Sequence, residues 1–388
     1  MSGAHRIRVF GGDIVALAAA IAYKRALPRA EVTLIGGEDD MAQPQYGAAG
    51  PILADFHRKI GLDARLFETA ARPVETRVSR FGNWGGARLS FGVPERGREP
   101  FADGAALHQL WLRREDAGDA PQPETLLDDR SAPPGYRFDA AGYRDLLRRM
   151  AGAIGIEQPS EPDGEACALE LDCRPYPQAD RTTSDWEDWS DFLPSFDAVD
   201  LQGAPTVQQA AEQISEQGGR LLLRIGQQSA TFAPAERRSG RAAQPWQGKR
   251  IAFGQAAIDV PPLYGLALST ALADILRAIR LLPPEGALDA VRGEYNRQTT
   301  AAHVATLEWA SAPFLLGAWA SIMPPGLTAI VEQFRHRGRL PLREGDPVSR
   351  GQWLALLIGC GLRPERIDPT ALLPTDQAAD RMLAAALS

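Results

Sequence analysis

Alternating and periodic apolar positions along the chain predict a mixed α/β protein. Residues 6–10 (RIRVF) suit a strand, residues 14–26 suit an alanine-rich helix that ends at Leu27-Pro28, and residues 31–35 (EVTLI) suit a second strand. A Gly11-Gly12-Asp13 turn separates the first strand from the helix. A strand, a glycine turn, a helix and a strand in this order predict a βαβ unit with parallel strands and a right-handed crossover.

The remaining pattern predicts further strands over residues 77–91, 168–173, 220–225 and 250–253. It predicts helices over residues 51–60, 138–152, 266–282, 288–312, 328–337 and 350–358. Stretches rich in Pro, Gly and charged residues predict surface connections over 94–104, 113–134 and 174–191. No clean linker divides the chain, so we expect its N-terminal and middle parts to interleave in one module over residues 1–284, with a helical region over 285–388 packed on it.

Composition narrows the class of protein. The 388 residues are 44% hydrophobic, which excludes wholesale disorder, and the net charge of −7 argues against a nucleic-acid binder that uses a basic face. The longest apolar runs are too short, or too interrupted, to span a membrane. Cys167, Cys173 and Cys360 have no metal-ligand spacing, and the N-terminus carries no signal peptide, so we predict a cytoplasmic protein without a metal site.

Lysine is scarce in this chain. Of the 42 basic residues only Lys24, Lys59 and Lys249 are lysines, and the rest are arginines. Codon bias in a GC-rich genome explains this preference. It still limits any chemistry that requires a lysine amine to three candidates.

The turn after the first strand resembles a dinucleotide-binding turn, but it is incomplete. Against the pattern G-x-G-x-x-G, the three glycine positions hold Phe10, Gly12 and Val15. Asp13 places a carboxylate where a diphosphate would sit, although it would cap an empty helix start well. Glu38 follows the second strand and could reach a ribose only through a shifted loop. Two alternatives remain, bound FAD or weak or absent binding, and these residues favour the second.

Several segments, in collinear order over about residues 6–300, resemble the flavin-dependent tryptophan halogenases, which belong to the wider flavoprotein monooxygenase fold. They include RFGNW where the family has K-F-x-N-W, LDC where it has D-C-S-G, and FGQAA where it has G-D-A-A-G. The segments are 27–35, 51–63, 80–84, 108–112, 136–139, 171–173, 253–257 and 295–297. The resemblance implies an FAD-binding sheet of Rossmann type, an interleaved mixed sheet and C-terminal helices. It places the cofactor-binding positions at Gly11, Gly12, Asp13, Glu38, Gly254, Gln255, Ala256 and Ala257.

The resemblance also implies a reaction. In the family, reduced FAD, oxygen and chloride give hypohalous acid, a lysine receives or positions the halogen, and a glutamate assists. In this chain the lysine position holds Thr76 and the glutamate position holds Tyr264. The family's W-x-W-x-I-P segment aligns with residues 221–226 (LLLRIG), which contain neither tryptophan nor proline, and Gln255 and Ile258 replace an Asp and a Gly of G-D-A-A-G. A Thr hydroxyl can neither form a haloamine nor act as a cationic donor.

Three functions remain open. The losses favour a catalytically degenerate protein that is kept to bind a small aromatic ligand or a protein partner. The alternatives are a flavin-dependent monooxygenase that uses other residues and an active halogenase acting on an aromatic, indole-like substrate. His108 suits an acid–base role, but a structural role is favoured. The tryptophans Trp186, Trp189, Trp309 and Trp319 suit either an aromatic pocket or the core, with the core favoured, and aromatic C-terminal helices make a homodimer plausible.

Overall fold

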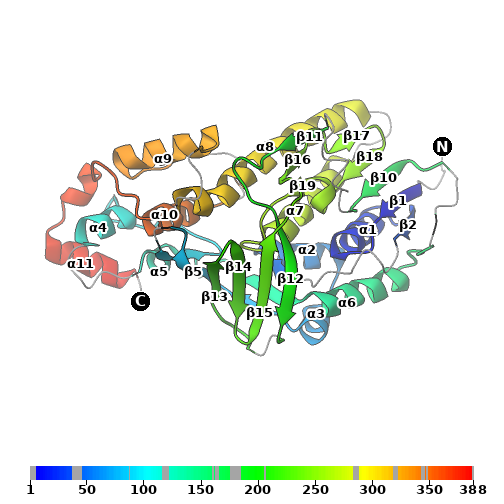
Figure 1. Cartoon of the computed structure of the whole chain (residues 1–388), viewed down its shortest axis with the longest axis horizontal. Helices are drawn as coiled ribbons and strands as arrows, with labels where there is room; N and C mark the ends of the chain where they lie inside the picture. The colour runs from blue at the N-terminus through cyan, green and yellow to red at the C-terminus, as the bar shows by residue number, and fades with distance from the viewer. Residues whose placement is uncertain are drawn as a thin grey trace.

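The βαβ unit forms one edge of a five-stranded sheet (Figure 1). The computed structural model describes residues 6–36, 46–86, 88–115, 122–159, 161, 166–174, 185–204, 207–282, 288–317, 322–341, 346 and 348–386. Strands β1 (Arg6–Phe10) and β2 (Glu31–Ile35) pair in parallel around helix α1 (Ile14–Ala26), as predicted. Residues 14–23 of α1 are all buried, because the helix lies between the sheet and two further helices. Its many alanines allow that close packing.

Strands from distant parts of the chain complete this sheet. The strand order is β17-β18-β10-β1-β2, and all neighbours are parallel except β17 and β18. The added strands are β10 (Leu169–Asp172), β17 (Trp246–Gln247) and β18 (Arg250–Ala252). Helices α6 (Ala140–Ala153) and α7 (Leu266–Leu281) pack against α1.

A six-stranded sheet forms the second layer, in the order β12-β15-β14-β13-β5-β6. Only β13 and β5 pair in parallel, and the other pairs are antiparallel. The strands are β5 (Val78–Trp84), β6 (Leu89–Pro94), β12 (Phe196–Gln202), β13 (Glu212–Gln217), β14 (Arg220–Ile225) and β15 (Gln228–Pro234). A three-stranded sheet, β3-β9-β4, contains β3 (Tyr46–Ala49), β4 (Val74–Thr76) and β9 (Gly135–Asp139).

The smaller elements complete the fold. The remaining strands are β7 (Phe101–Ala102), β8 (Ala105–Ala106), β11 (Trp186–Asp188), β16 (Gly240–Ala242) and β19 (Ile258–Asp259). Short helices are α2 (Ile52–Ile60), α3 (Ala64–Ala71), α4 (Leu107–Arg114), α5 (Pro123–Leu127), η4 (Gly254–Ala256) and η5 (Pro369–Leu372). The C-terminal helices are α8 (Leu288–Leu316), α9 (Pro325–Arg337), α10 (Arg350–Gly359) and α11 (Asp376–Ala385).

The C-terminal helices share a core with the six-stranded sheet. Buried side chains of β5, β6 and β14 join those of α8, α9 and α10 in one apolar cluster, while the five-stranded sheet and α1 form a second. Helix α8 runs from the five-stranded sheet to the far side of the molecule, where α4, α9, α10 and α11 gather (Figure 1). No helix in the described ranges is long and apolar enough to cross a membrane.

Two expectations about surface connections were wrong in part. Residues 113–134 include α5, whose Leu126 and Leu127 are buried beside α10. Residues 174–191 include β11, and Trp186 is buried there. Strands β12, β13 and β15 lie outside the segments that the apolar pattern marked. They are mostly polar sequences whose pairing with β5 and β14 decides their conformation, so local periodicity gives little sign of them.

The docking of α10 on the segment after β6 can be tested with two helical glycines. A Cβ on Gly351 would lie 2.4 Å from backbone atoms of Arg98, whereas a Cβ on Gly293 in α8 meets nothing within 4 Å. Gly351→Ala should therefore lower the free energy of unfolding by about 1–3 kcal/mol, because backbone must move. Gly293→Ala should raise it by up to about 1 kcal/mol through helix propensity. Urea unfolding measures both, and equal stability of the two variants would contradict this docking.

Candidate functional site

The turn after β1 closes tightly against the end of β2. The N–H of Gly11 donates to the carbonyl of Ile35 at 2.9 Å, and Gly11 adopts φ +128°, which side chains rarely tolerate. A Cβ on Gly36 would lie 2.5 Å from the carbonyl carbon of Gly11. Gly11 and Gly12 are buried. Glycine is therefore required here for the packing of the turn itself.

Asp13 caps helix α1. Its carboxylate accepts a hydrogen bond from the backbone N–H of Ala16 at 2.8 Å. Unpaired N–H groups at a helix start are what a bound phosphate would use. In this chain one of them is taken by the protein's own carboxylate, which also brings negative charge to the position.

Phe10, at the first glycine position of the pattern, faces a cationic neighbour. The guanidinium of Arg174 lies 5.1 Å from the centre of the Phe10 ring, at a distance typical of cation–π contact. Arg174 also donates to Asp172 at 3.0 Å, and Arg250 pairs with the same carboxylate. Burial raises the pKa of Asp172, but the contacts with Arg174 and Arg250 outweigh it, so the pKa is lowered. Large side chains and an ion-pair cluster thus lie at the carboxyl ends of β1 and β10.

The second predicted cofactor segment lies beside the first. A Cβ on Gly254 would lie 3.2 Å from a methyl group of Val15, the residue at the third glycine position. Ala256 and Ala257 are fully buried, whereas Gln255 is exposed. The fold therefore brings Val15 and Gly254 close together. Glu38 lies outside the described residues.

Thr76, at the family's lysine position, is fully buried in β4. Its hydroxyl donates to the backbone carbonyl of Val78 at 3.2 Å. The three lysines lie elsewhere: Lys24 donates to the carbonyl of Ala30, Lys249 pairs with Glu170 at 3.0 Å, and Lys59 is exposed on α2. None of the three lysines therefore occupies the position where the resemblance places the family's lysine.

Tyr264, at the family's glutamate position, belongs to the aromatic core. Its ring lies 5.1 Å from that of Trp309 and 5.6 Å from that of Phe81. Its hydroxyl is buried, makes no hydrogen bond with the described residues, and has a pKa raised chiefly by burial. The backbone of Tyr264 is left-handed (φ +58°), which is costly for a bulky residue.

A buried polar network lies beside Thr76, and sequence reasoning missed it. Arg137 is fully buried on β9 and donates twice to Glu212, at 2.7 Å each, and once to Glu95 at 2.7 Å. The hydroxyls of Tyr46 and Ser79 donate to the Glu212 carboxylate at 2.9 and 3.1 Å. The sequence does not indicate this network, because its five residues lie on five separate segments that meet only in the fold.

Thr76 is adjacent to this network through its strand partner. Thr76 pairs with Gly135 of β9, and a Cβ on Gly135 would lie 2.6 Å from the Glu95 carboxylate. Burial raises the pKa of Glu95 to about 6, against the opposing effect of Arg137. The buried Thr76 is therefore one strand partner away from the Glu95 carboxylate of this network.

His108 and three of the tryptophans are part of the core. His108 is buried, its Nε2 contacts the carbonyl of Gly338 at 2.8 Å, and burial lowers its pKa. Trp186, Trp189 and Trp309 are buried as well, and Trp189 and Trp309 belong to the apolar cluster of the six-stranded sheet. These are the structural roles that the sequence favoured. Trp319 lies outside the described residues.

The network should make stability depend on pH. The pKa of Glu95 is raised from 4.5 to about 6 in the folded state, so folding favours its protonated form. That contribution is fully present below pH 4.5 and is lost as pH rises through 6, on the order of 2 kcal/mol.

Glu95→Gln keeps an acceptor for Arg137 and does not titrate. The difference in unfolding free energy, variant minus wild type, should therefore grow between pH 4.5 and 7. Urea unfolding at the two pH values measures this difference. Glu332→Gln, at an exposed carboxylate on α9, is the control and should show little change. A pH-independent difference for Glu95→Gln would contradict the expected titration.

The sequence and the fold of this chain are similar to those of known proteins. The profile of the tryptophan halogenases matches residues 6–162 and 220–375. The fold is similar to BrvH, a flavin-dependent halogenase from Brevundimonas sp. BAL3 (17% identity, TM-score 0.82, covering 99% of this chain and 95% of that one). It is also similar to a flavin-dependent halogenase from Xanthomonas campestris (17%, 0.84, 99% and 94%) and to the tryptophan 6-halogenase SttH from Streptomyces toxytricini (17%, 0.80, 99% and 95%). No curated protein matches the chain significantly. Because the profile covers most of its length, the chain belongs to the tryptophan halogenase family.

Proposed function

We propose that this chain retains the flavoprotein fold of its family without the halogenation reaction, and that it serves to bind a ligand or a protein partner. The observation that carries the proposal is Thr76. Its hydroxyl is fully buried and hydrogen-bonded to the backbone where the family reaction needs an amine. A neutral hydroxyl there can neither carry nor position the halogen.

The region around Tyr264 supports the same proposal. The assisting carboxylate is replaced by a ring that packs between Phe81 and Trp309. Leu221 and Leu223, which replace the two tryptophans of the family segment, are fully buried in the core of the six-stranded sheet. Gly226, in place of the proline, lies with a positive φ in the tight turn between β14 and β15. These positions have become ordinary packing and turn positions.

Weak or lost FAD binding is part of this proposal. The residues at the phosphate turn do not fit a diphosphate well: Asp13 already caps α1, Phe10 faces Arg174, and Val15 fills the space beside Gly254. A diphosphate would meet a carboxylate and bulky side chains where the family pattern provides glycine and open N–H groups.

The second candidate is an FAD-dependent halogenase or monooxygenase that acts on an aromatic, indole-like substrate. Membership of the family and the closeness of Val15 to Gly254 favour it. In either case we propose a cytoplasmic protein. The three buried, unpaired cysteines suit a reducing compartment.

A flavin titration separates the two candidates. The purified protein should show no flavin absorbance near 450 nm, and added FAD should remain removable by gel filtration. Incubation with indole, chloride, oxygen, FAD and a flavin reductase should give no chlorinated product by mass spectrometry. A yellow protein that retains stoichiometric flavin would overturn the proposed cofactor loss, and chlorinated indole would overturn the loss of reaction.

Restoring the amine alone should not restore the reaction. In Thr76→Lys the new side chain starts at a fully buried position beside the Glu95 carboxylate, and the phosphate turn is unchanged. We expect no chlorinated indole in the same assay, with thermal unfolding as the check that the variant is folded. Recovery of activity by this single change would mean that the cofactor turn is intact in function.

A further inference from the structure

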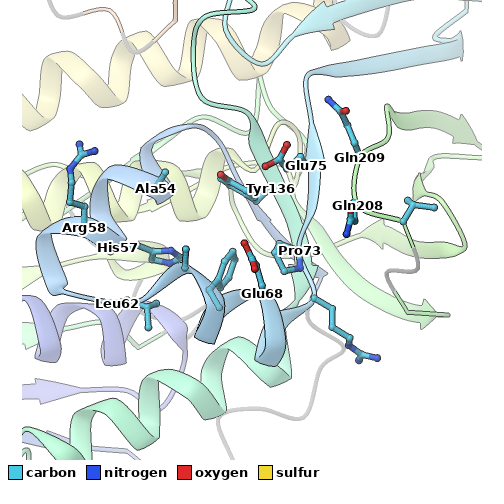
Figure 2. Close-up of a pocket in the computed structure, with 14 residues that line it drawn as sticks. Ala54, His57, Arg58, Leu62, Glu68, Pro73, Glu75, Tyr136, Gln208 and Gln209 are labelled. Carbon is cyan, nitrogen blue, oxygen red and sulfur yellow. The ribbon is translucent and has the colours of Figure 1, made fainter.

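A pocket of about 840 Å³ lies between α2, α3 and β4 (Figure 2). Glu75, which lines it, is exposed and alternates with the buried Thr76 along β4, so the pocket lies on the opposite side of that strand from the Thr76 side chain. This volume is within the range of small-molecule sites. A further wall is the segment at Gln208, which is joined to β4 by a hydrogen bond from the N–H of Glu75 to the carbonyl of Gln208 at 2.8 Å. The pocket is thus built from regular elements and a paired segment.

Aromatic side chains line one side of this pocket. The rings of His57 and Phe67 lie 4.6 Å apart in an edge-on arrangement, and those of Phe67 and Tyr136 lie 6.0 Å apart. Such a row offers an apolar surface to a ligand and a negative ring face to a cation.

Two carboxylates and two arginines line the pocket, and the carboxylates have no ion-pair partner among the described residues. Glu68 and Glu75 line it and are both exposed, and neither forms an ion pair with the described residues. Figure 2 shows the Glu68 carboxylate in the middle of the pocket and the Glu75 carboxylate beside Tyr136. Burial, and after it Glu75 and Glu68, raise the pKa of Tyr136, while Arg77 partly opposes them.

The two arginines of the pocket wall do not cancel this charge. Arg58 pairs with Asp55 and points away from the pocket in Figure 2, and Arg72 pairs with Asp139 at 2.7 Å. Both aspartates lie outside the pocket lining. Each arginine therefore already pairs with a carboxylate that lies outside the pocket lining.

His57 adds an unused polar atom. The side chain is 7% exposed, its Nε2 lies 2.8 Å from the Tyr143 hydroxyl, and its Nδ1 has no hydrogen-bond partner among the described residues. Burial lowers the pKa of His57 to about 4, so the ring is neutral near pH 7. With the proton on Nε2, donated to Tyr143, Nδ1 is left as an acceptor for a ligand N–H.

A metal ion is not the favoured occupant. In the described part of the chain, no group of three or more His, Cys, Asp and Glu side chains converges closely enough to hold one. Two separated carboxylates, a row of rings and a neutral imidazole instead match an ammonium group on an apolar body.

We propose that this pocket binds a small organic cation, with the ammonium between Glu68 and Glu75 and the apolar body against Phe67 and Tyr136. The inference rests on the proposed binding function and gives it a site and a ligand class. The pocket does not include the flavin turn. The amine titration and the flavin absorbance measurement therefore test the two proposals separately, and either proposal can fail without the other.

Isothermal titration calorimetry with phenethylamine tests the proposal, with phenethyl alcohol as the uncharged counterpart. We expect phenethylamine to bind at least about tenfold more tightly than the alcohol, and to bind less tightly as salt is raised. Glu68→Gln combined with Glu75→Gln should weaken phenethylamine about tenfold or more. Glu332→Gln, an exposed carboxylate on α9, is the matched control and should change nothing.

Since Glu68 and Glu75 are exposed, the double variant should fold, and circular dichroism with thermal unfolding checks this. Equal affinity for amine and alcohol, unchanged affinity in the double variant, or no amine binding up to millimolar concentration would each overturn the proposal. A short lysine-containing peptide forms a further arm. Binding of the peptide without binding of free phenethylamine would overturn the small-molecule assignment.

Discussion

The buried ion pairs of Arg137 with Glu212 and Glu95 connect the three-stranded sheet to the six-stranded sheet. Arg137 lies on β9 of the three-stranded sheet, Glu212 begins β13 of the six-stranded sheet, and Glu95 follows β6. Gln352 of α10 donates to the backbone carbonyl of Glu95 at 3.0 Å, so the C-terminal helices join the same point. Removing charges from water is costly, and an unpaired member of such a network costs more than the pair. The network therefore specifies one relative position of these elements, because any shift leaves a charge unpaired.

This constraint also affects the position where the family reaction needs a lysine. Thr76 lies one strand partner away from the Glu95 carboxylate and is closed off from water. Tyr264 packs between Phe81 and Trp309, and Leu221 and Leu223 are buried in the core of the six-stranded sheet. Under the proposed loss of the reaction, this packing stabilises the fold without a ligand at these positions.

The glycine turn after β1 and the pocket between α2, α3 and β4 differ in whether their polar groups already have partners. At the turn, Asp13 accepts a hydrogen bond from an N–H group at the start of α1. The neighbouring Arg174 and Arg250 both pair with Asp172. At the pocket, the arginines are paired away from the cavity while Glu68 and Glu75 remain unpaired among the described residues. Polar groups that already have partners gain little from a ligand, and those without partners gain more. The second site is therefore the better prepared to bind.

The sequence by itself determined the elements whose signals are local. The βαβ unit, the helices from α6 to α10 and the collinear family segments follow from apolar periodicity and short motifs, and the departures at Thr76 and Tyr264 can be seen from alignment with those motifs. Tertiary structure alone decided what depends on distant partners. The polar strands β12, β13 and β15 become strands only because β5 and β14 pair with them, directly or in turn. The network of Tyr46, Ser79, Glu95, Arg137 and Glu212, and the pocket that faces Glu68, join residues with no mutual spacing rule, because side-chain contact depends on the path of the backbone in space rather than on separation along the chain.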